Sequence, residues 1–195
     1  PDGNGKLSKR DGDRLGFPVF PLEWTDPETK EISSGYREKG YFPEAFVNMI
    51  AFLGWNPGTD QEVYSLTELV EAFSLERVGK SGSKFDADKT RWYNQTYLRT
   101  KSNEELAVLL KPALEQELIP FAEDKLPAYV ALMKERAFFV ADMKEGAYLF
   151  VRPIDYDEKL LGKKWKEGSG DIVLGLIETF SKTDYSAPAL HEKFS

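Results

Sequence analysis

The chain has 195 residues, of which 41% are hydrophobic and 13% aromatic, so it can bury a sizeable core in one or two domains. Because it has no cysteine and a single histidine, His191, disulfides, thiolate metal sites and histidine-based metal sites or triads are excluded. The net charge of -7 argues against a nucleic-acid partner unless positive charges gather locally.

The sequence contains no membrane-spanning or targeting pattern. No apolar run is long enough to cross a bilayer, and no charged segment precedes an apolar one as in a signal peptide. We therefore expect a cytoplasmic protein without a membrane partner. The chain begins at Pro1 rather than at methionine and stops at Ser195, just after a helix-compatible segment. Both ends indicate a piece of a longer protein.

Positive charges gather at two places. The first is the glycine-rich opening, PDGNGKLSKRDGD, which holds Lys6, Lys9 and Arg10. Glycine permits close backbone approach and lysine supplies charge, so such a loop can cradle phosphates, although the P-loop pattern is missing. The second is a lysine cluster that is typical of a solvated helix face: Lys159, Lys163, Lys164 and Lys166.

Residues 17–41 mix aromatic residues with three prolines and several turn signals. Because prolines disfavour a central strand, short extended pieces or a hairpin are expected here. A helix should follow, since Pro43 suits a first turn and Gly54 comes directly after the last apolar residue. This helix is apolar on more than one face, which predicts deep burial.

Three further helices have clear N-terminal signals. Ser65 with Glu68, and Ser102 with Glu105, have the spacing of capping boxes, and Asp86 is a good N-cap. The helix after Ser102 should bury one apolar stripe, made of Leu106, Leu109, Leu110, Ala113 and Leu114.

The rest of the chain also has helical patterns. One helix is expected from about Leu126 to Val140, and another from about Asp157 that carries the lysine cluster. Glycines at 168 and 170 should break the pattern before it resumes in DIVLGLIETFSK. The predicted fold class is therefore mainly α, a small mixed segment followed by a helical bundle. Strands and helices do not alternate, so the sequence contains no doubly wound nucleotide-binding sheet.

KLSKR, at residues 6–10, is similar to the KMSKS signature of class I aminoacyl-tRNA synthetases. Further motifs follow in the order and spacing of one family, so the chain resembles bacterial-type glutamyl-tRNA synthetases. The resemblance is firm over residues 1–100, fair to about 152 and weak beyond. The matching positions are Gly40 to Ala45, Asn48, Leu53 to Trp55, Phe73 to Val78, Phe85, Asp86, Lys89, Trp92, Asn94 and Tyr97.

The resemblance implies that the parent protein is a glutamate–tRNA ligase, which activates glutamate with ATP and Mg²⁺ and transfers it to tRNA(Glu). Lys9 matches the second lysine of the signature and would be catalytic, stabilising charge on the α-phosphate and the leaving pyrophosphate. Lys6 and the Leu7 backbone would lie near ATP. Because the chain lacks the catalytic domain, we expect it to be inactive alone and to need no cofactor. We also expect a monomer with no metal site and no DNA partner.

The resemblance also implies four segments. Residues 1–10 would be the KMSKS-type loop left from the catalytic domain, and residues 11–100 a stem-contact domain. Residues 101–165 would be a helical anticodon-binding domain, and residues 166–195 the start of a truncated C-terminal helical domain. Residues 17–35 look like an insertion relative to shorter family members, with a hairpin that packs its own aromatic rings.

Four residues are expected to contact tRNA. Lys89, Arg91 and Trp92 put two cations and an aromatic ring within one helical turn, a set that can pair with phosphates and stack on a base. The alternative is that Trp92 lies in the core. At about 100° per residue, Arg136 falls at the edge of an apolar stripe, beside Tyr129. LMKERAF matches the family segment with an anticodon-reading arginine, so the resemblance implies that Arg136 reads the first anticodon base.

Two other interpretations stay open. A free-standing helical module that binds RNA or another protein would explain the helices, but it would leave KLSKR without a role. A glutaminyl-tRNA synthetase fragment would share the signature loop, but that family builds its anticodon region from β-barrels. Residues 102–180 have helical patterns, which favours the glutamyl family.

Overall fold

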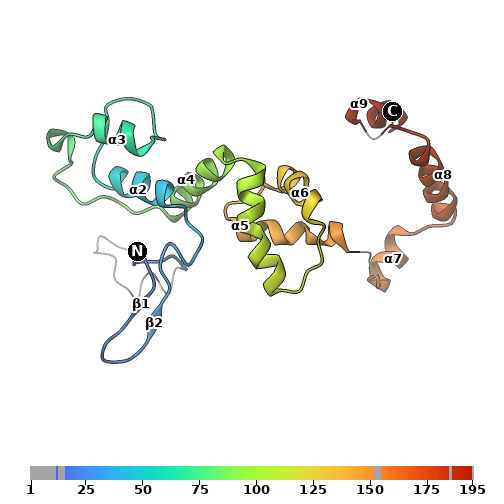
Figure 1. The fold of residues 1–195 in the computed structure, drawn as a ribbon, viewed down its shortest axis with the longest axis horizontal. Coiled ribbons are helices and arrows are strands. Elements are labelled where there is room, and N and C mark those ends of the chain that lie inside the picture. The colour runs from blue at the N-terminus through green and yellow to red at the C-terminus, as the bar shows by residue number, and fades with distance from the viewer. Residues whose placement is uncertain (1–11, 13–15, 152–154, 185, 195) are drawn as a thin grey trace. The chain divides into compact units, whose positions relative to one another are not determined.

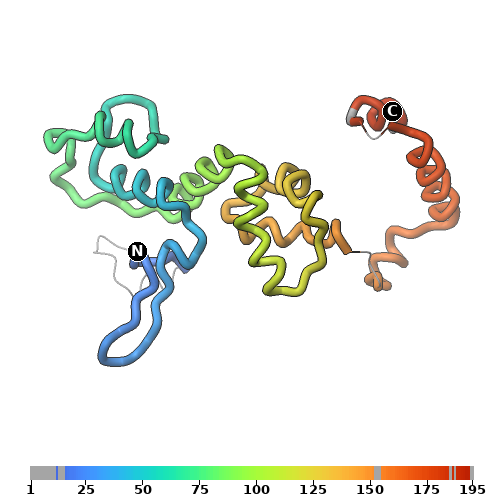
Figure 2. The backbone as a smooth tube through the Cα atoms, in the orientation of Figure 1, coloured from blue at the N-terminus to red at the C-terminus, as the bar shows by residue number. Residues whose placement is uncertain are grey.

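A computed structural model describes residues 12, 16–151, 155–184 and 186–194 (Figure 1). Contacts between residues divide the chain into two units, Pro1–Val151 and Arg152–Ser195. The backbone of the described part is mostly helical (Figure 2), so the mainly α fold class is confirmed. The residues expected to bind ATP, which are Lys6, Leu7 and Lys9, lie outside the described residues.

The first unit contains a small antiparallel hairpin, in which β1 (Trp24–Thr25) pairs with β2 (Ile32–Ser33). The Asp26 carboxylate accepts hydrogen bonds from two backbone N–H groups of the connecting turn, at 2.9 and 3.0 Å. The Phe20 ring stacks on Trp24, with 4.9 Å between the ring centroids. The expected hairpin with packed aromatic rings is therefore confirmed.

α2 (Pro43–Phe52) packs on α4 (Ala87–Thr100), and Pro43 occupies its first turn as predicted. Val47 and Ile50, however, are 41% and 48% exposed. The prediction of deep burial on several faces was wrong, because the described neighbours of α2 cover only part of its surface. Its buried residues are Ala45, Asn48 and Met49.

Both predicted capping boxes are present: Ser65 with Glu68 begins α3 (Leu66–Ala72), and Ser102 with Glu105 begins α5 (Asn103–Gln116). In each box the serine hydroxyl accepts a hydrogen bond from the glutamate N–H, and the glutamate carboxylate accepts one from the serine N–H. Asp86 caps α4 through two backbone N–H groups. Signals only a few residues long therefore determine where these helices begin.

A small second core lies between α2 and α3. Its buried residues are Trp55, Tyr64 and Leu69. The short 3₁₀ helix η1 (Leu75–Arg77) follows α3, and Val78 then forms an isolated antiparallel bridge with Trp55. This core holds the chain that leads into α4.

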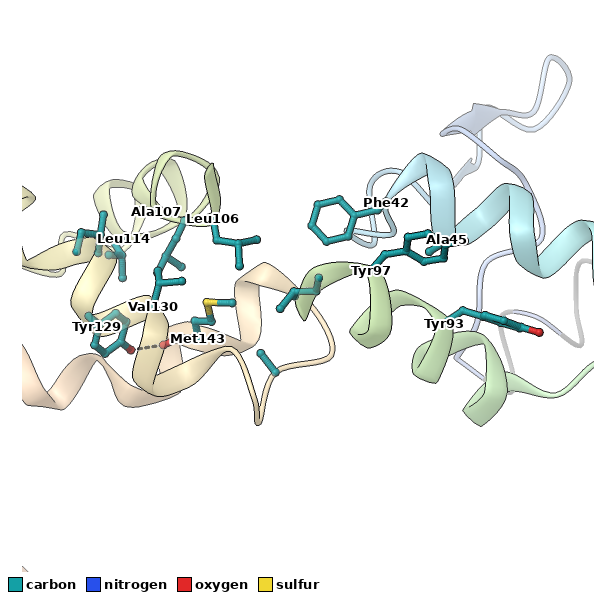
Figure 3. Close-up of a cluster of buried hydrophobic side chains, with 14 of the residues drawn as sticks. Phe42, Ala45, Tyr93, Tyr97, Leu106, Ala107, Leu114, Tyr129, Val130 and Met143 are labelled. Atoms are coloured by element: carbon teal, nitrogen blue, oxygen red, sulfur yellow. Dashed lines mark hydrogen bonds between the residues drawn. The ribbon is translucent and has the colours of Figure 1, made fainter. Parts of the chain in front are cut away.

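α5 packs against α6 (Leu126–Met133), which η2 (Glu123–Lys125) precedes, and against the 3₁₀ helix η3 (Val140–Phe150) (Figure 3). Leu109 is 49% exposed, so its predicted place in the buried stripe was wrong. The stripe that faces α6 and η3 is rotated by a fraction of a turn and includes a residue absent from the prediction, Ala107. The buried residues of α5 are Leu106, Ala107, Leu110 and Leu114.

The helix expected from Leu126 to Val140 ends at Met133. Residues 134–139 instead form an irregular turn, and the carbonyl groups of Ala137 and Phe138 accept hydrogen bonds from α4 rather than from a continued helix. Arg136 therefore lies in a turn and not at the edge of a helical stripe. Tertiary hydrogen bonds from α4 hold this turn.

The second unit contains α7 (Glu158–Lys164), α8 (Ser169–Ser181) and α9 (Ala187–Phe194). Asp157 caps α7 as expected, and Gly168, with φ of 82°, separates α7 from α8. The lysine cluster lies on and just after α7. Among the described residues, no helix has the length and apolar character needed to cross a bilayer. Large apolar side chains of this unit are exposed: Leu160, Leu161, Trp165, Ile172, Val173, Leu174 and Ile177.

Candidate nucleic-acid interface

α4 and the loop before it form a basic surface in an acidic chain. Residues 80–101 hold six cations and two carboxylates, whereas the whole chain has a net charge of -7. Such local charge attracts a polyanion even when the total charge is negative. The six cations are Lys80, Lys84, Lys89, Arg91, Arg99 and Lys101.

Two of the predicted cations lie in the first turns of α4, each beside a carboxylate. Lys89 forms an ion pair with Glu62, and Arg91 pairs with Asp88 at 3.0 Å. All four side chains are at least 43% exposed. Exposed pairs of this kind contribute about 0–1 kcal/mol, so exchanging the carboxylate for a phosphate costs little.

Trp92 lies at the border between surface and core. Its side chain is 38% exposed, and its ring centroid is 5.1 Å from that of Tyr93, which is only 2% exposed. The interpretation of Trp92 as a fully buried core residue does not hold. Part of the indole packs against Tyr93 and part is exposed to solvent, so an exposed portion of the ring is accessible to a base or sugar.

A hollow of about 310 Å³ lies next to Lys89, between α2 and α4. Its lining combines apolar residues of α2 with Lys84 and Tyr93. Burial raises the pKa of the Tyr93 hydroxyl, and the charge of Glu62 raises it further, so this hydroxyl stays protonated at neutral pH. The hydroxyl has no hydrogen-bond partner within the described residues.

Arg136 lies in the turn after α6, and its side chain is exposed. Its backbone N–H donates to the Met133 carbonyl at 3.0 Å. Within the described residues, its guanidinium has neither a hydrogen-bond nor an ion-pair partner. By contrast, Arg99 of α4 pairs with Glu135, the residue directly before it, at 3.1 Å. A planar guanidinium with free donors is suited to a base edge or a phosphate.

The structure does not gather the four predicted contact residues into one site. Lys89, Arg91 and Trp92 share the N-terminal half of α4, whereas Arg136 lies beside its C-terminal half, where Arg99 contacts Glu135. From Lys89 to Arg99, the rise along the helix is about 15 Å. From Trp92 to Gln95, whose amide bonds to the Ala137 carbonyl beside Arg136, the rise is only about 5 Å.

Several residues of the family motif have structural roles. Asn94 is fully buried: its Oδ1 accepts from the Phe42 N–H at 2.8 Å, and its Nδ2 donates to the Phe138 carbonyl at 2.7 Å. Asn48 and Tyr97 join α2 to α4 in the same way. These polar residues organise the scaffold and do not face a ligand.

Sequence reasoning missed Lys84 as a candidate contact. It lies in the loop before α4 and lines the hollow beside Lys89. The signal was available, because the density of cations over residues 80–101 can be counted directly. The prediction was limited to Lys89, Arg91 and Trp92, which lie within one helical turn.

The described residues contain no group of three or more acidic or histidine side chains placed to hold a metal ion. The lysines that would meet ATP lie before residue 12 and are not among them. The candidate interface on these parts of the chain therefore consists of cations, aromatic rings and backbone turns.

Two family models match this chain, one over each half. Residues 3–92 match the family model for the catalytic domain of class I tRNA synthetases (E and Q), and residues 105–195 match the model for an anticodon binding domain. A glutamate–tRNA ligase from Phocaeicola vulgatus is 55% identical over 185 residues, which cover 94% of this chain and 37% of that protein. The chain matches the C-terminal portion of bacterial glutamate–tRNA ligases. A further ligase of this family, from Christiangramia forsetii, is 50% identical and covers 98% of this chain and 38% of that protein.

Solved structures of glutamate–tRNA ligases have the same fold over this region. The ligase from Elizabethkingia meningosepticum, in complex with its amino acid, matches with a TM-score of 0.88 at 44% identity. The synthetase from Elizabethkingia anophelis matches with a TM-score of 0.85, also at 44% identity. Each match covers 98% of this chain and 38% of the solved chain, so the chain spans less than two fifths of the ligases that it matches.

The two other interpretations of the sequence are now disfavoured. Glutamate–tRNA ligases match nearly the whole chain, which is not expected of a free-standing module. Residues 103–150 are built from α5, α6 and short 3₁₀ helices, and not from the β-barrels expected of a glutaminyl-tRNA synthetase.

Proposed function

We propose that this chain binds tRNA as the stem-contact and anticodon-binding portion of a glutamate–tRNA ligase. The complete ligase would activate glutamate with ATP and Mg²⁺ in the cytoplasm, form glutamyl-adenylate, and transfer the glutamyl group to tRNA(Glu). The observation that carries the proposal is the basic and aromatic surface of α4, in a chain that is otherwise acidic.

The segments would divide the work as the sequence indicated. Residues 1–10, with Lys6, Leu7 and Lys9, would complete the ATP site of the catalytic domain. Residues 11–100 would contact the tRNA stem, residues 101–165 would bind the anticodon, and residues 166–195 would begin a further helical domain. A monomer would be sufficient for these roles.

Each contact residue has a distinct chemical role in this proposal. Lys89 and Arg91 would exchange their carboxylate partners for backbone phosphates, which positions the RNA without reading its sequence. Trp92 would stack on a base or sugar. Arg136, with free donors, would form hydrogen bonds to the edge of an unstacked anticodon base and so carry sequence information.

Salt dependence of binding tests the phosphate contacts. A tRNA(Glu) transcript should bind this chain weakly, and its affinity should fall steeply as the salt concentration rises from about 50 to about 200 mM. Arg91→Ala should weaken binding and flatten the salt dependence by about one phosphate contact. The matched control is Lys182→Ala, because Lys182 also pairs with a carboxylate one helical turn before it, Glu178, at 2.6 Å, and lies outside the segments proposed to contact tRNA. If both variants weakened binding equally, Arg91 of α4 would not be part of the interface.

Activity measurements test the division between this chain and the rest of the ligase. The isolated chain should neither activate glutamate nor charge tRNA, and pyrophosphate exchange by the purified chain would contradict this. In the intact ligase, Arg136→Ala should reduce selection of the correct anticodon more than it reduces glutamate activation. Equal losses in both measurements would show that Arg136 does not read the anticodon.

A further inference from the structure

The turn that carries Arg136 is held by one face of α4. Gln95 Nε2 donates to the Ala137 carbonyl at 3.2 Å, and Asn94 Nδ2 donates to the Phe138 carbonyl at 2.7 Å. The Arg99 guanidinium donates to the backbone carbonyl of Glu135 and also pairs with its carboxylate. The backbone on both sides of Arg136 is therefore bonded to a single helix.

Other parts of the first unit anchor the same turn from different directions. The Phe139 ring packs edge-on against Tyr41, with 4.8 Å between centroids and 80° between planes. The Asp142 carboxylate accepts from the backbone N–H groups of Phe138 and Phe139, at 2.9 and 2.8 Å. Lys134 Nζ donates to the Lys101 carbonyl at 3.2 Å. Every residue of the turn except Arg136 thus takes part in a hydrogen bond, ion pair or ring contact with another part of the unit. For Ala137 this contact is the hydrogen bond that its carbonyl accepts from Gln95.

The backbone of the 134–139 turn is held in place, whereas the guanidinium that it carries, that of Arg136, is unpaired among the described residues. Ala137 is 2% exposed, whereas the guanidinium of Arg136 has no partner among the described residues. A group that must discriminate between bases by hydrogen bonds has to be placed to within about 0.5 Å by the residues around it. The three donors of α4 hold the backbone from which the Arg136 side chain extends. These three donors, Asn94, Gln95 and Arg99, which we call the clamp, lie on the same helix as Lys89, Arg91 and Trp92. The clamp therefore also fixes the backbone of the turn relative to these residues.

We propose that Gln95 and Arg99, together with Asn94, are positioning residues that hold the 134–139 turn and thereby determine how selectively Arg136 reads the anticodon. The inference rests on the proposed function of Arg136. It goes further in assigning a specificity role to residues that need not contact RNA. Their removal should lower the discrimination between anticodons while the chain stays folded.

The test uses the variant Gln95→Met/Arg99→Met in the full 195-residue chain. Both replacements keep an unbranched side chain on α4 and remove the donors to the turn, and Asn94 is left intact because it also holds the Phe42 N–H. The matched control is Gln61→Met/Arg37→Met. Gln61 donates to a backbone carbonyl at 3.0 Å and Arg37 pairs with a carboxylate, but neither contacts the turn.

The measured quantity is the ratio of dissociation constants for a tRNA(Glu) transcript and for transcripts in which one anticodon base is replaced. The original chain should bind the tRNA(Glu) transcript more tightly than the altered transcripts. In the clamp variant, Gln95→Met/Arg99→Met, this preference should be about 3- to 10-fold smaller, a change that corresponds to the loss of about one hydrogen bond. Control variants should keep the ratio. A variant with Lys instead of Met at position 99, Gln95→Met/Arg99→Lys, retains a cation opposite Glu135. It should discriminate between anticodons better than the clamp variant does. Urea denaturation of each variant verifies that the chain is folded, and Gln95→Met alone replaces the double variant if that one unfolds.

A double-mutant cycle with Arg136→Ala separates positioning from other effects. In the Arg136→Ala background, the clamp variant should cause no further loss of the ratio. If the original chain discriminates and the clamp variant discriminates equally well, the positioning role is overturned and the proposed function stands. A loss that persists in the Arg136→Ala background also overturns it. If the original chain shows no discrimination, the proposed role of Arg136 itself fails.

Discussion

The Tyr97 hydroxyl donates a hydrogen bond to Asn48 Oδ1 over 2.9 Å, and this bond joins α4 to α2 in a buried site. Asn48 also accepts from the Tyr64 N–H at 2.8 Å and donates to the Glu62 carbonyl at 2.8 Å. One side-chain amide therefore links two helices and the chain that connects α2 with α3. Because Asn48 is fully buried, water cannot replace these partners.

Removing one partner of this network should destabilise the first unit measurably. Tyr97→Phe should lower the free energy of unfolding by about 1 kcal/mol, because it removes the one hydroxyl hydrogen that the Tyr64 carbonyl and Asn48 Oδ1 share. Asn48→Ala should cost about 3 kcal/mol, since it leaves buried backbone groups unpaired and creates a cavity. Urea denaturation measures both. Tyr148→Phe, at a residue that is 70% exposed, is the control and should change stability by less than about 0.5 kcal/mol.

Loss of a helix cap provides a second prediction. Ser102→Ala removes the hydroxyl that accepts from the Glu105 N–H at 3.1 Å, and it should lower the free energy of unfolding by about 1 kcal/mol. Ser74→Ala is the matched control, because Ser74 begins η1 without any side-chain capping bond. Similar losses in the two variants would show that the capping box contributes nothing.

The capping boxes also predict how stability depends on acid. Hydrogen bonds from the backbone N–H and hydroxyl of Ser102 lower the pKa of Glu105 from its ordinary value of 4.5, and Ser65 lowers that of Glu68 in the same way. A carboxyl group whose pKa is lower in the folded state binds fewer protons there than in the unfolded chain. Its contribution is complete above about pH 4.5 and is lost as the pH falls through the folded pKa.

Unfolding free energies measured from pH 7 to pH 3 by urea denaturation test this dependence. Stability should decrease as the pH drops below the ordinary carboxyl value. Glu68→Gln/Glu105→Gln keeps the geometry of both boxes, because glutamine also serves at this position, but it cannot titrate. The slope of stability against pH in the acid range should be smaller for this variant. An unchanged slope would show that Glu68 and Glu105 do not cause the loss of stability in acid.

Close packing around Gly146 gives a fourth prediction. A Cβ atom added there would lie 2.6 Å from Met133 Sδ and 2.8 Å from the Tyr129 hydroxyl. Gly146→Ala should therefore lower stability by about 1–3 kcal/mol, although alanine favours helix. Gly162→Ala in α7 is the control, because its added Cβ would meet nothing within 4 Å. Circular dichroism should show equal or greater helicity for the control variant.

Helix starts could be predicted because their signals are local. Ser102 and Glu105 are three residues apart, and no distant residue is needed for the serine and glutamate to bond to each other's backbone. Buried faces were predicted less well. Leu109 and Ile50 continue an apolar pattern but stay about half exposed, because burial depends on which neighbours reach each face.

The candidate site shows the same division. The pattern Lys89, Arg91 and Trp92 was visible in the sequence, and so was Arg136 through its family motif. The end of α6 at Met133 could not be predicted from the sequence, because the apolar periodicity continues to Ala137. Only the folded chain reveals that Asn94 and Gln95 of α4 bind carbonyl groups of the turn that follows α6.

The sequence by itself determined the mainly helical class, the capped starts of α3, α4, α5 and α7, and the resemblance to glutamate–tRNA ligases. These depend on neighbours within a few residues or on motifs in fixed order. Tertiary structure decided where α6 ends, which leucines are buried, and that α4 holds the turn of Arg136. These depend on hydrogen bonds and packing between residues that lie far apart in the sequence, 42 and 44 positions for the bonds of Gln95 and Asn94, which no local pattern encodes.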